Sequence, residues 1–302
     1  MRTSVVLNLI AAERRHIERL ASILHNKPDF KIYPNGRTGR LHLSVPEGDP
    51  DVQLFESYCR EHDIRFMKGR TRSYSNSEMD AAPYLWLACD GEAVDLDGTR
   101  FTDENACPKC GIGRKLAVPL VIPLGRIAGK KTFGFGFRHD FAWVVSKEVS
   151  EALRSCTGFT LGPVCDTRAP TTPVDSFYLL IVENYLRRMA TITNFSEYDP
   201  PLRPRCECNR AGWNLRDEMF YEWEALRNAK DFNLTVERLY GGGFGINRLL
   251  VSQKVRQIFL KDSFLPKRAG FEPVHPIEKD PGTKHKFDLP LDLPASAERG
   301  SP

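Results

Sequence analysis

The segments FAWVVSKEVSEAL, residues 141–153, and NRLLVSQKVRQIF, residues 247–259, share a V-S-x-x-V pattern and decide the fold of the larger part of the chain. In each, an apolar run ends at a serine, Ser146 or Ser252, and apolar residues then recur at helical spacing. Serine is a preferred N-cap because its hydroxyl accepts a hydrogen bond from the first helical turn. Each segment therefore predicts a strand that leads through serine into a short amphipathic helix.

Three further landmarks surround both segments in the same order. A close cysteine pair and a glycine-aromatic run precede each one, and a Gly-Phe pair followed by Pro-Val comes after it, at 158–164 and at 270–274. Because serine is a common N-cap, the strand-serine-helix junction alone could recur independently, but that alternative does not explain the cysteines. We expect an internal duplication, with repeats at about 105–165 and 204–275 in a strand-rich, zinc-ribbon-like unit.

The cysteine pairs carry the chemistry of this unit. Cys107-Pro108-Lys109-Cys110-Gly111 has the spacing of a zinc knuckle, in which two intervening residues let both sulfurs reach one tetrahedral ion. Cys206 and Cys208 have one residue between them and form the weaker half. Four thiolates make the closed ligand set of a structural zinc, so we predict one Zn²⁺ per chain held by Cys107, Cys110, Cys206 and Cys208. Surface or redox cysteines are the alternative.

The other four cysteines, Cys59, Cys89, Cys156 and Cys165, are expected in the core. Cys156 and Cys165 could replace a ligand if the second pair fails. The apolar run at 5–10 is too short for a signal sequence or a membrane span, which predicts a cytoplasmic protein with no membrane partner. Cysteines stay reduced in that compartment, which favours metal over disulfides.

Residues 1–104 have the pattern of a separate small α/β module. Strand-like runs alternate with helical spacing, Asn35-Gly36 marks a hairpin, and Val52, Phe55 and Cys59 form one helical stripe. Two β-α-β passages predict a ferredoxin-like arrangement. Residues 276–302 lack periodicity and are rich in Pro, Ser and charge, which predicts a disordered tail. The expected class is α+β, with the duplicated domain at 105–275.

Composition and charge narrow the functional classes. A hydrophobic fraction of 41% and a charged fraction of 27% are typical of globular proteins and exclude collagen and coiled coil. The formal charge of +4 is too weak to predict a nucleic-acid partner by itself. A zinc-ribbon nucleic-acid binder stays open as an alternative because basic residues and phenylalanines interleave beside the first knuckle. These residues are Arg114, Lys115, Arg126, Lys130, Lys131, Phe133, Phe135, Phe137 and Arg138.

Catalytic motifs are weak. GRIAGKKT, residues 125–132, has three residues between its glycines where a phosphate loop needs four. Arg138-His139-Asp140 places an imidazole beside a carboxylate, but neighbours on a strand point to opposite faces. Helical spacing in 219–232 marks Phe220, Trp223 and Leu226 as a core-packing or partner-docking helix. We expect no enzymatic activity and no small-molecule substrate, with an enzyme of unknown class as a further alternative.

The stretch from Cys107 to Val274 resembles the bacterial double-CxxCG motif family. The resemblance lies in CPKCG, in WVVS with its helix, in the second cysteine pair and in the closing LLVSQKV and GFEPV. Some members of that family are immunity proteins that neutralise a cognate toxin. The resemblance implies a zinc-bound fold carried by Cys107, Cys110, Cys206 and Cys208, and a protein partner such as a toxin. This chain departs from the family where C-E-C-N replaces C-x-x-C-G, and in its long amino-terminal module.

Overall fold

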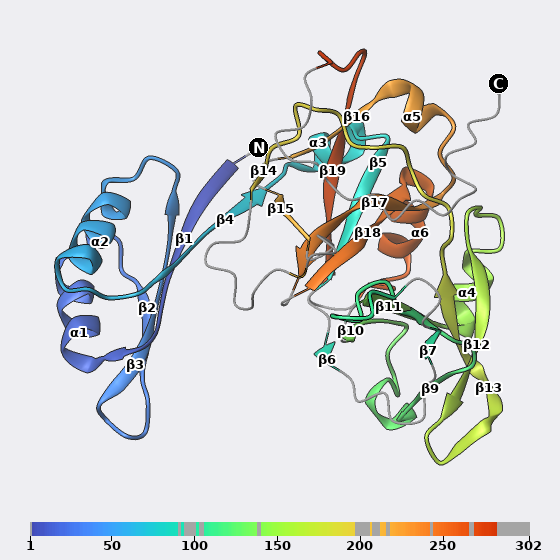
Figure 1. Ribbon diagram of the computed structural model, residues 1–302, viewed down its shortest axis with the longest axis horizontal. Helices are drawn as coiled ribbons and strands as arrows, with labels where there is room; N and C mark the ends of the chain where they lie inside the picture. The colour runs from blue at the N-terminus through green and yellow to red at the C-terminus, as the bar shows by residue number, and fades with distance from the viewer. Residues whose placement is uncertain are drawn as a thin grey trace. The chain divides into compact units, whose positions relative to one another are not determined.

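The chain forms two compact units, at residues 1–78 and 79–302, in a strand-rich α+β architecture (Figure 1). The expected α+β class is confirmed. The computed structural model describes residues 2–89, 92–93, 101–102, 106–137, 140–196, 206, 212–215, 218–241, 244–265 and 269–282. In these described ranges no helix has the length and apolar character to cross a membrane.

The first unit is an antiparallel sheet covered on one face by two helices (Figure 1). Its strands lie in the order β2-β3-β1-β4, and all neighbours are antiparallel. With α1 after β1 and α2 after β3, this is the β-α-β-β-α-β order of ferredoxin-like modules. The elements are β1 (Arg2–Glu13), α1 (Arg14–Ile23), β2 (Asp29–Ile32), β3 (Thr38–Pro46), α2 (Pro50–Glu61) and β4 (Met67–Ser73), followed by α3 (Asn76–Ala81).

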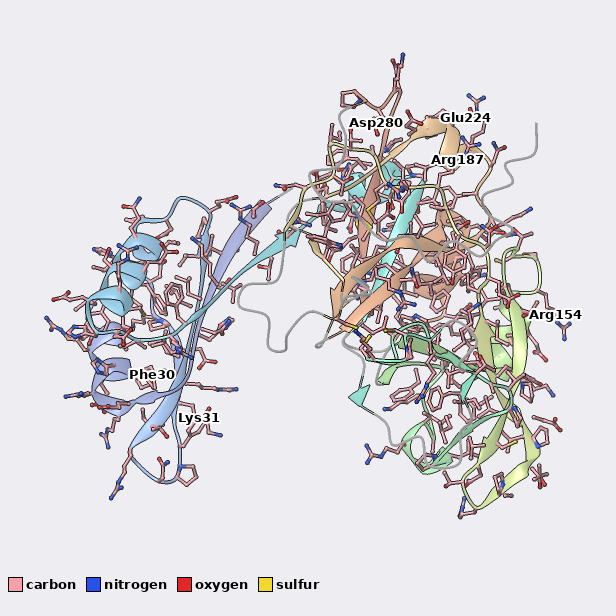
Figure 2. All side chains as sticks on the ribbon, in the orientation of Figure 1. Phe30, Lys31, Arg154, Arg187, Glu224 and Asp280 are labelled. Atoms are coloured by element: carbon pink, nitrogen blue, oxygen red, sulfur yellow. The ribbon has the colours of Figure 1, made fainter. Side chains whose placement is uncertain are left out.

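Alternation along the strands builds the core of this unit. Leu41, Leu43 and Val45 occupy every second position of β3 and are buried, because alternate residues of a strand share one face. The stripe of Val52, Phe55 and Cys59 is buried on α2, as predicted. Phe30, by contrast, is 46% exposed on the edge strand β2 (Figure 2).

The described part of the second unit contains two larger sheets and two short strand pairs. The first sheet has the order β6-β10-β11-β13-β12-β9, and its elements are β6 (Glu92–Ala93), β9 (Leu120–Ile122), η1 (Leu124–Arg126), β10 (Thr132–Phe137), β11 (Asp140–Ser146), α4 (Lys147–Ala152), β12 (Thr160–Asp166) and β13 (Ala169–Ile181). The second sheet has the order β16-β19-β5-β18-β17, and its elements are β5 (Tyr84–Cys89), β16 (Met219–Glu222), α5 (Trp223–Arg227), β17 (Phe232–Gly241), β18 (Phe244–Ser252), α6 (Gln253–Lys261) and β19 (Ala269–Ile277). The short strand pairs are β7 (Phe101–Thr102) with β8 (Lys115–Leu116) and β14 (Phe195–Ser196) with β15 (Asn214–Leu215).

Both larger sheets follow one plan. Five strands of the first sheet, in the order β10-β11-β13-β12-β9, match β17-β18-β5-β19-β16, with a parallel pair at the β9 and β16 edges and antiparallel neighbours between the other strands of each five. The first sheet has one more edge strand, β6, which is parallel to β10. The equivalent strands β11 and β18 each end at a capping serine. Ser146 Oγ accepts from Val149 N, and Ser252 Oγ accepts from Val255 N. The two predicted strand-serine-helix junctions are confirmed.

The middle strand of each sheet comes from a different part of the chain. Phe177 of β13 lies opposite Ser146, and Tyr84 of β5 lies opposite Ser252. β13 follows β12 in the chain, whereas β5 precedes the first cysteine pair and pairs with strands near the end of the chain. The boundary expected between residues 104 and 105 therefore falls inside the second unit, whose start at Met79 is determined by the non-local pairing of β5.

The two sheets share a core. Trp143 and Leu180 of the first sheet and Leu249 and Phe232 of the second belong to one buried cluster. Separate clusters cover the outer face of each sheet. The shared cluster holds the two sheets in one unit through apolar contact.

Two expectations change in this unit. The helical spacing at 219–232 belongs to a strand, β16, and the short helix α5. Burial alternates along Met219–Glu222, so the strand period prevails there over the helical one. The tail expected from residue 276 begins within β19, and Asp280 accepts hydrogen bonds from the backbone N and the Oγ1 of Thr191 (Figure 2). Residues 283–302 lie outside the described residues.

Candidate metal centre

The first knuckle is the turn between β7 and β8, in which Phe101 pairs with Leu116. Cys107 N donates to Ile112 O at 2.8 Å, and Gly111 N donates to Cys107 O at 2.7 Å. Gly111 has a φ of 76°, a left-handed conformation that glycine adopts without strain. The local hydrogen bonds thus close the predicted knuckle around Cys107 and Cys110.

Cys206, the described member of the second cysteine pair, lies between two paired strands in the same way. Phe195 of β14 pairs with Leu215 of β15, as Phe101 pairs with Leu116 in the first hairpin, and Cys206 lies in the chain between β14 and β15. Each hairpin precedes the edge strand of one large sheet, β9 or β16. Cys206 therefore has the same position relative to β14, β15 and β16 that Cys107 and Cys110 have relative to β7, β8 and β9.

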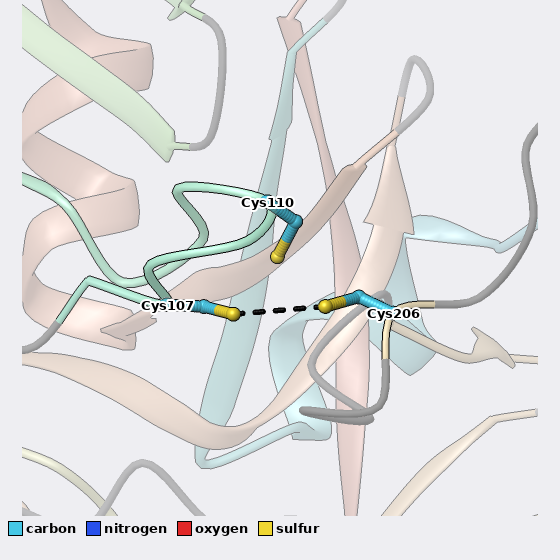
Figure 3. A group of neighbouring side chains, drawn as sticks. All are labelled: Cys107, Cys110 and Cys206. Carbon is cyan, nitrogen blue, oxygen red and sulfur yellow. Dashed lines mark hydrogen bonds between the residues drawn. The ribbon is translucent and has the colours of Figure 1, made fainter.

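Three thiols from these hairpins converge (Figure 3). The Sγ atoms of Cys107, Cys110 and Cys206 lie within 4.8 Å of one another, and Cys107 Sγ is 3.6 Å from Cys206 Sγ. A disulfide would require about 2.05 Å, so these are free thiols. Zinc-sulfur bonds of 2.3 Å around a tetrahedral ion separate the sulfurs by about 3.8 Å. The observed spacing could thus hold a metal ion.

The electrostatics favour a thiolate at the first ligand. Backbone N–H groups of Cys110 and Lys109 donate to the Cys107 sulfur and lower its pKa from 9.0 to about 6, with smaller contributions from the thiols of Cys110 and Cys206. A soft metal binds the deprotonated form of cysteine. All three cysteines are half-buried.

The cluster contains three of the four predicted zinc ligands, and Cys208 lies outside the described residues. Cys59, Cys156 and Cys165 are buried, as expected for core cysteines, and none of them belongs to the cluster. Burial raises the pKa of Cys59 to about 11 and also raises that of Cys156. Cys89 lies on β5. No described residue offers a replacement for the C-x-C pair at the cluster.

The basic residues beside the first knuckle, the basic belt, are Arg114, Lys115, Arg126, Lys130, Lys131 and Arg138. Two of its lysines contact other residues of the chain. Lys131 Nζ bonds Glu148 Oε1 at 3.0 Å, and Lys130 Nζ lies 4.3 Å from the centroid of the Phe133 ring. Arg138 and His139 lie outside the described residues. Lys130 and Lys131 lead into the strand β10, so the backbone there lacks the helix start that a phosphate loop requires.

One feature of the second unit was not predicted, a cavity of about 180 Å³ that both large sheets line. Its wall includes Trp86, Trp143 and Arg248, which come from three different strands. The sequence marks these strands only as apolar, because the cavity depends on how the two sheets meet.

Comparison of the chain with protein families gives no match, and comparison with curated proteins gives none either. The resemblance to the double-CxxCG family therefore stays a prediction that rests on the quoted motifs.

Proposed function

We propose that this chain is a cytoplasmic, non-enzymatic protein-binding protein whose second unit is a duplicated zinc-ribbon-like domain stabilised by one structural zinc. The observation that carries the proposal is the convergence of Cys107, Cys110 and Cys206, which come from two hairpins far apart in the chain. An ion at this point would bridge the two halves of the unit, a structural role.

The duplication is supported by more than the cysteines. Five strands of each sheet share one order and direction, β11 and β18 both end at a capping serine, and Cys107, Cys110 and Cys206 lie between paired strands that precede an edge strand. We infer that two copies of one unit exchanged their middle strands, so that β5 completes the later sheet and β13 the earlier one. Neither copy would then bury its sheet alone.

The identity of the metal and its fourth ligand follow from chemistry. Thiolates select soft or borderline ions, and a four-thiolate tetrahedral set is typical of structural zinc. Cys208 is the proposed fourth ligand because it is two residues from Cys206, in the hairpin equivalent to that of Cys107 and Cys110. A set of four leaves no open position for water or substrate, which agrees with a non-catalytic role.

Metal analysis tests the zinc centre. Purified chain is expected to contain about one zinc equivalent, and Cys107→Ser or Cys208→Ser to lose most of it and to unfold at a lower temperature. Cys165→Ala is the matched control, because Cys165 is buried on β12 apart from the cluster and its loss should leave the zinc content unchanged. Zinc below about half an equivalent in the unaltered chain would refute a structural site.

The proposed partner is a protein, specifically a bacterial toxin neutralised by this chain, and it rests on the family resemblance. Co-expression with the product of each neighbouring gene tests it directly. Protection from one toxic product, lost in a variant that no longer binds that product, is the expected result. Absence of protection from every adjacent product would eliminate the immunity role while leaving the zinc centre untouched.

Nucleic-acid binding by the basic belt is the competing proposal. Its contacts with phosphates would make affinity fall steeply as salt rises. Titration of mixed-sequence oligonucleotides at low salt separates the two, since the protein-binding role predicts no saturable binding. If oligonucleotide binding is found, replacing Lys130 and Lys131 by Gln should weaken it.

A further inference from the structure

The outer edge of β2, in the first unit, pairs with no described strand, because β2 is the end strand in the order β2-β3-β1-β4. Tyr33 N donates to Thr38 O on the β3 side, and the direction of the backbone groups alternates along an antiparallel strand. Lys31, two residues before Tyr33, therefore also turns its N–H and C=O groups toward β3. Phe30 and Ile32 turn theirs toward the free edge, where they can pair with another strand.

The side chains at this edge are exposed (Figure 2). Phe30 lies opposite the buried Leu41 of β3, on the helix-covered face of the sheet, yet 46% of its surface is exposed. Asp29 and Lys31 lie on the opposite, open face, because neighbouring residues of a strand alternate between faces. Lys31 is paired across the strands with Arg40, a like charge, and neither Asp29 nor Lys31 makes an ion pair with another described residue.

We propose that this edge is a dimer interface, at which β2 of a second copy of the chain pairs antiparallel with β2 about a two-fold axis at Phe30. Phe30 of each copy would donate its backbone N–H to the Phe30 carbonyl of the other, and the two rings would lie side by side on the helix-covered face. On the open face, Asp29 of each copy would lie opposite Lys31 of the other. Such a contact is self-complementary and therefore stops at two copies.

Charge selects this register over its two neighbours. An axis one residue later in the chain would place Lys31 opposite Lys31 of the second copy, and an axis one residue earlier would place Asp29 opposite Asp29. Like charges directly opposite each other on paired strands are destabilising, and opposite charges are favourable. Of these three registers, only the axis at Phe30 makes two opposite-charge pairs. The lysine that protects an edge strand from unspecific pairing would here exclude the wrong registers.

The size of the contact limits its strength. A strand of 4 residues, one aromatic pair and two exposed ion pairs bury less surface than the roughly 1,600 Å² of a standard stable interface. We therefore expect a reversible dimer with a Kd of about 10–100 µM instead of a permanent one. The contact involves the first unit alone, so it does not depend on the proposed metal centre of the second unit.

Analytical ultracentrifugation of the full chain in reducing buffer, from about 1 to 500 µM, tests the proposal. Lys31→Asp and Asp29→Lys each place like charges opposite each other and should weaken dimerisation by about tenfold. The variant that carries both changes restores two opposite-charge pairs and should dimerise as tightly as the unaltered chain. Arg65→Glu reverses an exposed charge just before β4, at the other edge of the sheet, and should change nothing.

Hydrogen exchange of the unaltered chain tests the pairing without a variant. The backbone amides of Phe30 and Ile32 should become more protected as the protein concentration rises, whereas the amide of Lys31, which faces β3, should be protected at every concentration. Three results would overturn the proposal. They are a chain that stays monomeric up to about 500 µM, a dimer that Lys31→Asp does not weaken, and a double variant that dimerises no better than the single ones.

Discussion

Asp51 and Glu237 are both fully buried carboxylates, yet their surroundings shift their pKa values in opposite directions. Asp51, at the start of α2, accepts hydrogen bonds from the backbone and side chain of both His25 and Asn26. Burial alone would raise its pKa, but these donors outweigh burial and hold the pKa well below its usual value. The carboxylate therefore fastens the loop after α1 to the start of α2 in its ionised form.

Asp51→Asn is expected to lower the free energy of unfolding of the first unit by about 2–3 kcal/mol, because an amide replaces a charged acceptor of several donors. Urea unfolding measures the loss of stability, and hydrogen exchange at the His25 and Asn26 amides shows whether it is local to this contact. Since the folded pKa is depressed, the contribution is present above the unfolded value of 3.8 and is lost as pH falls below it. Asp29→Asn, at an exposed position of β2, is the control, and an equal loss in both variants would contradict the assignment.

Glu237 shows the opposite behaviour in the second unit. Its Oε1 accepts from Met189 N at 2.8 Å, and its Oε2 is buried with no hydrogen-bond partner among the described residues. Burial raises its pKa from 4.5 to about 7, against smaller opposing effects from Met189 N and the charge of Arg188. The native state therefore keeps a proton that the unfolded chain has already lost between pH 4.5 and 7.

As pH rises from 4.5 to 7, Glu237 is expected to lower the free energy of unfolding by about 3 kcal/mol, because the unfolded chain loses this proton first. Glu237→Gln does not titrate and should not show this decrease. Urea unfolding at pH 5 and pH 8 measures the free energy of unfolding of both chains. The unaltered chain should lose more stability between the two pH values than the variant does. Glu224→Gln changes an exposed carboxylate on α5 and should show no such difference (Figure 2). A pH-independent gap between unaltered chain and Glu237→Gln would argue against a protonated buried acid.

At the scale of elements, the two capping serines allow a matched comparison. Ser146 and Ser252 each accept from the N–H three residues later, but Ser252 Oγ also donates to Asp231 Oδ1 at 2.7 Å. Ser146→Ala should cost about 1 kcal/mol and Ser252→Ala about 2 kcal/mol in chemical unfolding of the zinc-loaded chain. Equal costs would show that the bond to Asp231 contributes nothing to stability.

These junctions were predictable because their determinants are local. A β-rich run, a serine and apolar residues at helical spacing suffice to place β11 with α4 and β18 with α6. The partners of β5 were not predictable, because its strand pattern carries no information about which distant strands it joins. The same limit moved the domain boundary, since β5 pairs with β18 and β19 near the other end of the chain.

At the scale of the whole molecule, the cysteine cluster could be predicted from the sequence and the cavity could not. The spacing of Cys107 and Cys110 predicts a knuckle from neighbouring residues, and the order of landmarks predicts that Cys206 joins it. The cavity had no such signal, because the strands that line it come together only when distant strands pair and the two sheets pack. Chemistry encoded by short spacing is therefore visible in the sequence, and chemistry created by packing is not.

If the proposed zinc is bound, its removal is expected to affect the two units differently. The three clustered cysteines all belong to the second unit, and the free energy of a structural site is largely folding free energy. Treatment with a zinc chelator is expected to raise the hydrogen exchange of backbone amides in residues 106–116 and 212–215. The amides of Leu41, Leu43 and Val45 on β3, in the first unit, should stay protected. Added zinc should restore protection, and Cys107→Ser should reproduce the loss without chelator. Equal loss of protection in β3, or unchanged exchange in both hairpins, would contradict a metal that stabilises the second unit alone.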